Sequence, residues 1–251
     1  MKAFLLAGGH GTRLRPLTDT TPKCLLPIRG TPILQIWFTL CRQFGIEEVL
    51  INLHSHGDVV RRFVEEHKNG LTIGLFEESA LLGSAGTILA NRDWIRKENS
   101  FWVFYADVLT TTNLTQILDF HNSHGQIATI GTYEVPNPSR CGIVQVDNGG
   151  IVRDFVEKPA TPIGNLAFSG LMLATPALLD EIPDISPVDL GFHVLPKLVG
   201  RMAAYQIPDF LLDVGTLETY QAAQESWPGL SESQKNKVTL CSEAQSSPST
   251  E

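Results

Sequence analysis

The first half of the chain alternates between apolar runs and amphipathic segments, a pattern typical of parallel strands joined by helices. Apolar runs at 3–7, 48–53 and 101–105 predict strands buried on both faces, and a further strand is expected at 71–76. The spacing of apolar residues predicts helices at 32–44, 58–67, 85–91 and 114–121. This alternation indicates βαβ units and therefore a mostly parallel sheet with helices on both faces.

From residue 126 onward the pattern changes to short strands joined by turns. Strands are expected at 128–135, 142–146, 151–156 and 167–173, with a hairpin signal, Asp-Asn-Gly-Gly, at 147–150. We therefore predict a single α/β domain over residues 1–230, a Rossmann-like three-layer sandwich with a mostly parallel sheet and a mixed or antiparallel edge region. Residues 231–251 lose apolar periodicity, and we expect them to form a disordered tail.

Composition and charge narrow the function classes. The 251 residues include 19 Lys and Arg against 27 Asp and Glu, and the resulting net charge of −8 argues against a general nucleic-acid-binding protein. The four cysteines stand far apart without a C-x-x-C pair, which indicates free thiols in a reducing compartment. The N-terminal apolar run is too short for a membrane span. We expect a cytoplasmic protein without a membrane partner.

A glycine-rich loop with neighbouring cations follows the first predicted strand. It reads G-G-H-G-T-R-L-R-P-L-T over 8–18, and P-K-C-L-L-P follows over 22–27. In α/β folds, ligands bind at the carboxyl ends of parallel strands, where glycine-rich backbone can hold phosphate. A dinucleotide fingerprint would need a glycine in place of Leu14, and a P-loop would need Gly-Lys-Ser/Thr, which the chain lacks. A purely structural turn would not explain why Arg13 and Lys23 gather here.

These two runs resemble the signature of the sugar-1-phosphate nucleotidylyltransferases, and the resemblance extends over roughly residues 1–224. It implies the nucleotide-diphospho-sugar transferase type of fold, and transfer of a nucleoside monophosphate from an NTP to a sugar 1-phosphate with release of pyrophosphate. By the family pattern the catalytic residues are Arg13, which would hold the triphosphate, and Lys23, which would lie against the reacting phosphates. The implied nucleotide-binding residues of the loop are Ala7, Gly8, Gly9, Gly11 and Thr12.

A second segment, E-S-A-L-L-G-S-A-G-T over 78–87, resembles the family element E-x-x-x-L-G-T-A-G. In relatives that act on mannose 1-phosphate with GTP, this element lines the nucleobase pocket and begins a helix. The resemblance therefore favours GTP, and it implies nucleotide contacts from Glu78, Gly83, Ser84 and Gly86. Without the resemblance, the segment is a loop with a serine at a helix N-cap.

Two aspartates resemble the magnesium ligands of the family. Asp107 follows the apolar run 101–106, and Asp213 lies in L-D-V-G-T over 212–216. Taken alone, an aspartate after a strand is more often a helix cap. Two carboxylates together with phosphate and water oxygens suit octahedral Mg²⁺, which is therefore the expected cofactor.

Two further segments resemble the sugar-phosphate-binding elements of the family. F-V-E-K-P over 155–159 matches V-E-K-P, in which the glutamate, here Glu157, contacts sugar hydroxyls and the lysine, here Lys158, contacts the sugar phosphate. N-L-A-F-S-G over 165–170 occupies the region where many relatives have N-A-G, which implies contacts from Ser169 and Gly170. Because a phenylalanine replaces the motif asparagine at 168, an ordinary hexose specificity cannot be carried over.

Several alternatives stay open at the level of sequence. UTP competes with GTP, because the aromatic-Ser-Gly run at 168–170 also occurs in short uridylyltransferase relatives. A non-catalytic nucleotide-sugar-binding regulatory subunit of the same fold is a second class, although such proteins tend to lose one of the residues corresponding to Arg13, Lys23, Asp107 and Asp213. A third alternative keeps the enzyme fold but replaces the sugar acceptor by a phosphocholine-like or phosphonate alcohol. A homodimer is a possible assembly.

Overall fold

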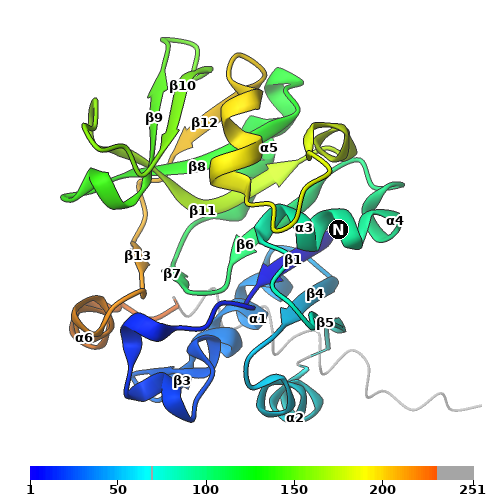
Figure 1. The fold of residues 1–251 in the computed structure, drawn as a ribbon, viewed down its shortest axis with the longest axis vertical. Coiled ribbons are helices and arrows are strands. Elements are labelled where there is room, and N and C mark those ends of the chain that lie inside the picture. The colour runs from blue at the N-terminus through cyan, green and yellow to red at the C-terminus, as the bar shows by residue number, and fades with distance from the viewer. Residues whose placement is uncertain (69, 231–251) are drawn as a thin grey trace, which may run out of the picture.

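The computed structural model describes residues 1–68 and 70–230, so the tail expected at 231–251 lies outside the described residues. A nine-stranded mixed sheet runs through the molecule in the order β10-β9-β11-β6-β1-β4-β5, with β8 paired to β11 and β12 paired to β8. Figure 1 shows β8, β9, β10 and β12 in the upper part and β1, β4 and β5 in the lower part. The predicted α/β class, with an antiparallel region beside a parallel sheet, is confirmed.

The parallel part of the sheet consists of the strands with continuous apolar runs. They are β1 (Lys2–Leu6), β4 (Glu48–Leu53), β5 (Thr72–Glu77) and β6 (Phe101–Tyr105). Strand β1 lies between β4 and β6, and its Ala3 is in register with Val49 on one side and with Trp102 on the other. Each of these strands begins and ends within one residue of its predicted bounds. In β1, β4 and β6, burial on both faces gives a strong apolar signal, whereas β5 is an edge strand with exposed and half-buried residues.

The antiparallel part is joined to the parallel part through β11. Its strands are β8 (Ala128–Glu134), β9 (Gly142–Val146), β10 (Val152–Glu157) and β11 (Leu166–Ala174). Residue Ala167 of β11 pairs with β9, whereas residues 171–174 pair with β6. Between these two stretches the register with β8 shifts, and Gly170 has a φ of 80°. This bulge marks where β11 changes its neighbour from β9 to β6.

Several short strands had no signal in the sequence. They are β12 (Met202–Gln206), the pair β7 (Val108–Thr110) and β13 (Leu211–Asp213), and the pair β2 (Pro27–Ile28) and β3 (Thr31–Pro32). Strand β12 runs parallel to β8, and β7 and β13 form a separate antiparallel ladder. Strands β2, β3, β7 and β13 have only two or three residues, too few to show a period, so their tertiary pairing defines them.

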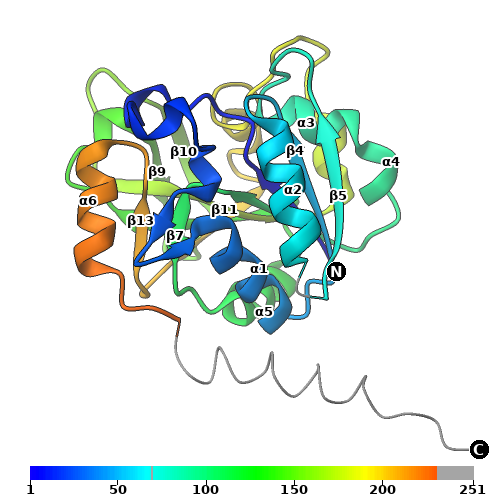
Figure 2. The ribbon, with the colours of Figure 1, turned by 90° about the horizontal axis from the view of Figure 1, so that it is seen from below.

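Helices cover both faces of the sheet. They are α1 (Ile33–Gln43), α2 (Gly57–His67), α3 (Ser84–Ala90), α4 (Arg92–Ile95), α5 (Leu114–His124) and α6 (Leu217–Ser226). Short 3₁₀ turns occur at Thr12–Leu14, Leu17–Asp19, Lys23–Leu25, Pro138–Arg140, Pro176–Glu181 and Leu195–Leu198, and a π-helical turn occurs at Leu190–Val194. In Figure 2, α6 lies at one end of the molecule and α4 at the other.

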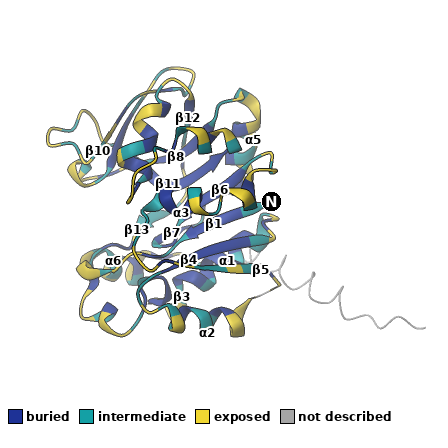
Figure 3. Cartoon of the chain, turned by 45° about the vertical axis from the view of Figure 1, so that its right-hand side comes forward, coloured by how far each residue is buried: buried dark blue, intermediate teal, exposed yellow. Residues whose placement is uncertain are grey.

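Successive side chains of the central strands point to opposite faces, and each face has its own apolar core. Leu5 and Phe104 pack with Trp37 of α1 on one face, whereas Phe4 packs with Ile88 of α3 on the other. Figure 3 shows this arrangement as buried strands between helices whose outer faces are exposed. Because the sheet is packed on both faces, the ends of its strands are held in place, and so are the side chains at those ends. Within the described residues, no helix is long and apolar enough to cross a membrane.

Candidate active site

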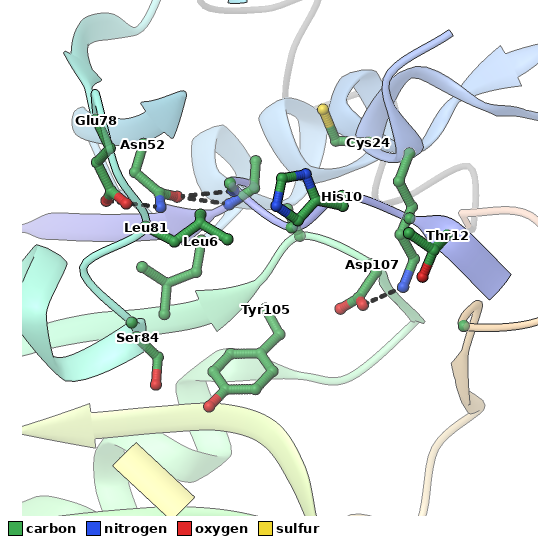
Figure 4. A pocket seen from close by; sticks show the side chains of 18 of the residues that line it. Leu6, His10, Thr12, Cys24, Asn52, Glu78, Leu81, Ser84, Tyr105 and Asp107 are labelled. Carbon is green, nitrogen blue, oxygen red and sulfur yellow. Dashed lines mark hydrogen bonds and ion pairs between the residues drawn. The ribbon is translucent and has the colours of Figure 1, made fainter. Parts of the chain in front are cut away.

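A cavity of about 480 Å³ lies at the carboxyl ends of β1, β4 and β6. Figure 4 shows side chains from the loop after β1, from β4, from the segment before α3 and from the end of β6 around it. The residues predicted from sequence that lie on its walls are Ala7, Gly8, Gly9, Gly11, Thr12, Arg13, Lys23, Glu78, Gly83, Ser84 and Asp107. Motifs separated by up to a hundred residues meet here because parallel strands end at the same edge of the sheet.

The loop after β1 is held by a side chain that the sequence did not bring to notice. The Oδ1 atom of Asn52 accepts hydrogen bonds from the amides of Ala7, at 2.7 Å, and Gly8, at 3.2 Å. A Cβ on Gly8 would lie 2.6 Å from the Nδ2 atom of Asn52, so only glycine fits against this side chain. The two amides are therefore occupied, although both residues were predicted to contact the nucleotide.

The remainder of the same loop presents open donors to the cavity. Gly11 has a φ of 63°, which favours glycine, and its carbonyl accepts a 2.8 Å hydrogen bond from the Thr18 hydroxyl. Within residues 1–68 and 70–230, the amides of Gly9, His10 and Gly11 meet no protein acceptor. Open backbone amides in a glycine-rich turn are suited to binding phosphate oxygens.

The predicted catalytic lysine lies on the wall of this cavity. Lys23 begins the 3₁₀ turn Lys23–Leu25 and forms an ion pair with the carboxylate of Asp107, which follows β6. The side chain of Lys23 is only 12% exposed, so its ammonium group is held against the cavity rather than free in solvent. Arg13 lies nearby, with a terminal nitrogen 3.2 Å from the point where a Cβ on Gly215 would stand.

The two predicted metal ligands come from neighbouring segments. Asp213 ends β13, where it is in register with Val108, and the amide of Val214 donates a 3.0 Å hydrogen bond to the carbonyl of Asp107. Asp213 does not line the cavity itself. Desolvation raises the pKa of Asp213 to about 6, and the negative charge of Asp107 acts in the same direction. Two carboxylates placed close enough for one to raise the pKa of the other are suited to sharing a cation.

This donor set can be compared with the needs of Mg²⁺. Within the described part of the chain, no group of three or more His, Cys, Asp or Glu side chains could hold a metal ion. An ion between Asp107 and Asp213 would therefore take its other ligands from water and phosphate, as Mg²⁺ commonly does. Hard carboxylate oxygens beside open phosphate-binding amides fit this ion.

Glu78 is a firmly held carboxylate of the cavity and is only 5% exposed. Its Oε1 atom accepts hydrogen bonds from Asn52 Nδ2, at 3.0 Å, and from the Thr87 hydroxyl, at 2.5 Å. Its Oε2 atom accepts a 3.1 Å hydrogen bond from the amide of Leu82. A carboxylate oxygen can accept two hydrogen bonds, so Oε2 retains capacity for a donor in the cavity.

The segment that leads into α3 is packed against the backbone of Val188. The Val188 carbonyl accepts hydrogen bonds from the amides of Ala85 and Gly86, at 3.0 and 3.1 Å. Gly83 has a φ of 81°, and a Cβ there would lie 2.3 Å from the Val188 oxygen. Gly83 and Ser84 line the cavity, but Gly86 does not. The amide of Gly86, predicted to contact the nucleotide, is used to dock this segment instead.

Asp189 is a cavity residue that sequence reasoning missed. Its Oδ2 atom accepts a 2.9 Å hydrogen bond from the Ser84 hydroxyl, and its Oδ1 atom accepts from the amides of Gly191 and Phe192. The side chain thus caps the turn Leu190–Val194 and joins it to the segment before α3. Burial raises the pKa of the neighbouring Tyr105, and the charge of Asp189 adds to the effect. A lone aspartate in a loop carries no pattern that could have revealed this role.

Glu157 and Lys158 lie outside the walls of this cavity but adjoin it. A Cβ on Gly191 would lie 2.5 Å from the Oε2 atom of Glu157, which is therefore packed directly against the turn that Asp189 caps. Desolvation raises the pKa of Glu157. The positive charge of Lys158 opposes this increase, whereas the negative charge of Asp189 adds to it. Lys158 adopts a φ of 50° and places its ammonium group 5.2 Å from the ring centroid of the exposed Phe192.

Ser169 and Gly170, predicted to contact the sugar phosphate, are used by the sheet instead. Ser169 is 3% exposed, and its hydroxyl accepts a hydrogen bond from the amide of Leu171 and points toward Gly131. Gly170 is buried beneath Tyr105, whose Cβ would lie 3.1 Å from a Cβ at this position. The Ser-Gly pair forms the bulge of β11, which explains these residue types without a ligand.

The cavity offers no activated thiol. Cys24 lines it, but burial raises the pKa of this thiol to about 12, so the thiolate is absent at neutral pH. Cys41 and Cys141 are also free thiols whose pKa is raised by burial, and Cys241 lies outside the described residues. Chemistry in this cavity therefore depends on positioning and charge.

Comparison with known proteins gives a consistent result. A sequence profile of the family described as nucleotidyl transferase matches residues 2–228. The chain is 34% identical over 227 residues to the probable mannose-1-phosphate guanylyltransferase 2 of Oryza sativa subsp. japonica, and 33% identical over 227 residues to mannose-1-phosphate guanylyltransferase 1 of Arabidopsis thaliana. Each alignment covers 88% of this chain and 63% of the relative, so the chain spans less than two thirds of these proteins.

The fold also has counterparts among solved structures. A UDP-glucose pyrophosphorylase, solved in complex with UDP-glucose, superimposes with a TM-score of 0.77 at 22% sequence identity. The match covers 90% of this chain and 97% of that chain. At this identity the likeness concerns the architecture alone.

Proposed function

Because the chain belongs to the nucleotidyl transferase family, we propose that it transfers a nucleoside monophosphate from an NTP to a sugar 1-phosphate, forming an NDP-sugar and pyrophosphate. The observation that carries this proposal is the meeting of Arg13, Lys23 and Asp107 with the open amides of a glycine-rich loop in one cavity. Such a site can bind a triphosphate and offset the repulsion between two anionic reactants.

The reaction is a displacement at the α-phosphorus of the NTP. An oxygen of the sugar phosphate attacks the phosphorus, the bond to the β-phosphate oxygen breaks, and pyrophosphate leaves with the electron pair. The Lys23 ammonium offsets negative charge at the reacting phosphates, and Arg13 and the amides of Gly9 and Gly11 hold the triphosphate. Catalysis of this kind is mainly positioning and electrostatic stabilisation.

We propose Mg²⁺ as the cofactor, held by Asp107 and Asp213. When bound, it would supply positive charge that neutralises the phosphate oxygens. The support is the donor set, two adjoining carboxylates beside phosphate-binding amides, together with the raised pKa of Asp213. Lys23 pairs with Asp107 and keeps that carboxylate at the cavity wall.

GTP is the proposed nucleotide. Glu78 offers a hydrogen-bond acceptor to the cavity, and guanine presents two neighbouring donors, at N1 and at the 2-amino group. Uracil presents one donor between two carbonyl acceptors, which suits a carboxylate less well. The two similar relatives named guanylyltransferases give the same preference.

The acceptor is proposed to be a sugar 1-phosphate bound beside Glu157 and Lys158. The Glu157 carboxylate accepts from hydroxyl groups, and the Lys158 ammonium pairs with phosphate. Phe168 packs edge-on against Tyr105 and Phe155, so this wall is aromatic where the family motif has an asparagine. We further propose that residues 1–230 form the catalytic domain and that the protein acts in the cytoplasm.

The direct test is pyrophosphate release by the purified chain. GTP, UTP, ATP and CTP are each supplied with Mg²⁺ and a panel of sugar 1-phosphates, and pyrophosphate is measured through a coupled pyrophosphatase. We expect release that requires both substrates and Mg²⁺, is greatest with GTP, and is lost on adding EDTA. Nucleotide binding without release for any pair would favour the regulatory-subunit alternative.

A further inference from the structure

The carboxyl end of β4 binds Glu78 at its backbone and at its side chain. The amide of Glu78 donates to the carbonyl of Leu53 at 2.8 Å, and His54 Nδ1 lies 2.8 Å from the Glu78 carbonyl. Because a carbonyl only accepts, this nitrogen of His54 carries the proton. The third contact is the 3.0 Å hydrogen bond from Asn52 Nδ2 to the Glu78 carboxylate. Glu78 therefore has little freedom to move independently of β4.

Asn52 also binds the loop on the other side of the cavity. Its Oδ1 atom accepts from the amides of Ala7 and Gly8, which begin the glycine-rich loop. The orientation of the Asn52 amide follows from its partners, because backbone amides require an acceptor and a carboxylate requires a donor. Figure 4 shows this side chain between Glu78 and the loop. At 6% exposure, Asn52 is a buried link between two segments that both face the ligand.

The residues after Asn52 reinforce the same connection. His10 of the glycine-rich loop lies with its Nδ1 atom 2.9 Å from the Ser55 hydroxyl, and its ring packs edge-on against His54 with centroids 5.0 Å apart. Residues 52–55 thus contact the first part of the glycine-rich loop at several points. This gives the end of β4 a position between the loop that would bind phosphates and the carboxylate that would bind the base.

We propose that Asn52 is a positioning residue that sets the Glu78 carboxylate relative to the triphosphate-binding loop and thereby determines selection of guanine. The inference rests on the proposed function, because it assumes that the cavity binds an NTP. Without the Asn52 donor, the Oε1 atom of Glu78 keeps only the hydrogen bond from the Thr87 hydroxyl, and its Oε2 atom keeps only that from the amide of Leu82. The carboxylate can then turn away from the position where the 2-amino group of guanine can reach it.

The test compares GTP with ITP, which lacks only the 2-amino group of the base. Dissociation constants of both nucleotides are measured by calorimetry in the presence of Mg²⁺, with no acceptor added. We expect wild type to prefer GTP by about tenfold to a hundredfold, the value of one hydrogen bond to a charged group. Loss of general structure would weaken both ligands alike, whereas misplacement of Glu78 removes the difference between them.

The variant Asn52→Asp keeps an acceptor for the amides of Ala7 and Gly8 but turns a second oxygen toward Glu78. Because two carboxylates repel at this distance, Glu78 should turn away, and the preference for GTP should fall to about threefold or less. In the double variant Asn52→Asp with Glu78→Gln, the new amide can donate to Asp and still offer an oxygen to the base. We expect this pair to recover most of the GTP preference.

Asn91→Asp is the matched control. Asn91 directly follows α3, and its Nδ2 atom donates a 2.8 Å hydrogen bond to the Thr87 carbonyl. The Asn91 side chain does not line the cavity. The same chemical change there should leave the GTP preference unaltered.

Each outcome decides the matter. An unchanged GTP preference in Asn52→Asp, or a preference that stays collapsed in the double variant, would overturn the positioning role. Equal binding of GTP and ITP by wild type would overturn it as well, because there would be no guanine selection to set. A wild-type chain that binds no NTP would instead overturn the proposed function, and the inference with it.

Discussion

The ammonium group of Lys23 forms an ion pair with the carboxylate of Asp107, which joins the turn after the glycine-rich loop to the end of β6. The ion pair keeps both side chains at the cavity wall, and each neutralises the charge of the other while no ligand is bound. Asp107 is also a proposed ligand of the cation. A triphosphate and its metal ion would compete for these two charges. The pair would therefore link phosphate binding to metal binding.

Replacing Lys23 by alanine should reduce turnover by about a hundredfold or more, the typical cost of removing one preorganised charge contact with the reacting groups. Circular dichroism should show that the fold is retained. The matched control is Lys97→Ala, since Lys97 is exposed and lies away from the cavity. Near-wild-type turnover in folded Lys23→Ala would remove this lysine from the mechanism.

Asp107→Asn and Asp213→Asn should each abolish magnesium-dependent activity, and the double variant should be hardly worse than either single one. If both carboxylates hold one ion, either change removes the same unit, so the losses cannot multiply. Stability should be slightly higher in Asp213→Asn, because desolvation and the charge of Asp107 both disfavour this carboxylate. It should be lower in Asp107→Asn, because the mostly buried Lys23 loses its ion-pair partner. Turnover measured against magnesium concentration distinguishes this from independent, multiplicative losses.

Gly191→Ala should weaken binding of the acceptor without affecting the nucleotide. A Cβ there would lie 2.5 Å from the Glu157 carboxylate and must displace it, which should raise the KM for the sugar 1-phosphate about tenfold, the loss of roughly one hydrogen bond. The KM for the NTP and the Tm should stay close to wild type. Gly149→Ala, in the hairpin between β9 and β10, serves as the control. Equal changes in both KM values would argue against Glu157 as an acceptor ligand.

Two histidines on α5 share a hydroxyl group in a way that fixes their protons. The amide of Gln126 donates to His124 Nδ1, so the proton of His124 is on Nε2 and is donated to Thr129 at 2.9 Å. The Thr129 hydroxyl must then donate to His121 Nδ1, also at 2.9 Å. Both rings are therefore neutral, and burial lowers the pKa of His121 to about 4.

This arrangement predicts a loss of stability in mild acid. Because the native pKa of His121 is below its unfolded value of about 6.5, only the unfolded chain takes up this proton between those pH values. The free energy of unfolding should therefore be level above about pH 7 and fall by about 3 kcal/mol toward pH 4 on account of this group. Urea unfolding of His121→Gln should show a smaller fall over the same range. An identical pH dependence in both proteins would contradict the assignment.

The parts of the fold that sequence predicts are those whose local pattern agrees with their burial. Strands β4 and β6 match their predicted bounds because the apolar side chains that make up most of each strand lie in one core or the other. Strand β13 has only three residues and becomes a strand through pairing with β7. No local pattern could show that this pairing brings Asp213 beside Asp107; only the resemblance to a family implied it.

The site shows the same division. Residues close in sequence, such as Gly9 and Thr12, are recognised together because one loop brings them to the same cavity. Asn52 is a single polar residue near the end of an apolar strand, and its partners are 45 and 26 residues away in the chain. Motif spacing gave the position of Ser169 along the strand but not the bulge at Gly170, which decides how this strand is paired.

The close packing of Gly83 against Val188 has a consequence for protein engineering. Since the Val188 oxygen stands 2.3 Å from any Cβ at position 83, a combinatorial library that varies this position would consist largely of misdocked loops. Leu81 lines the cavity as well, but its position already carries a large side chain and can therefore be varied. A library aimed at altered nucleotide preference should therefore randomise position 81 and keep Gly83 and Val188 constant.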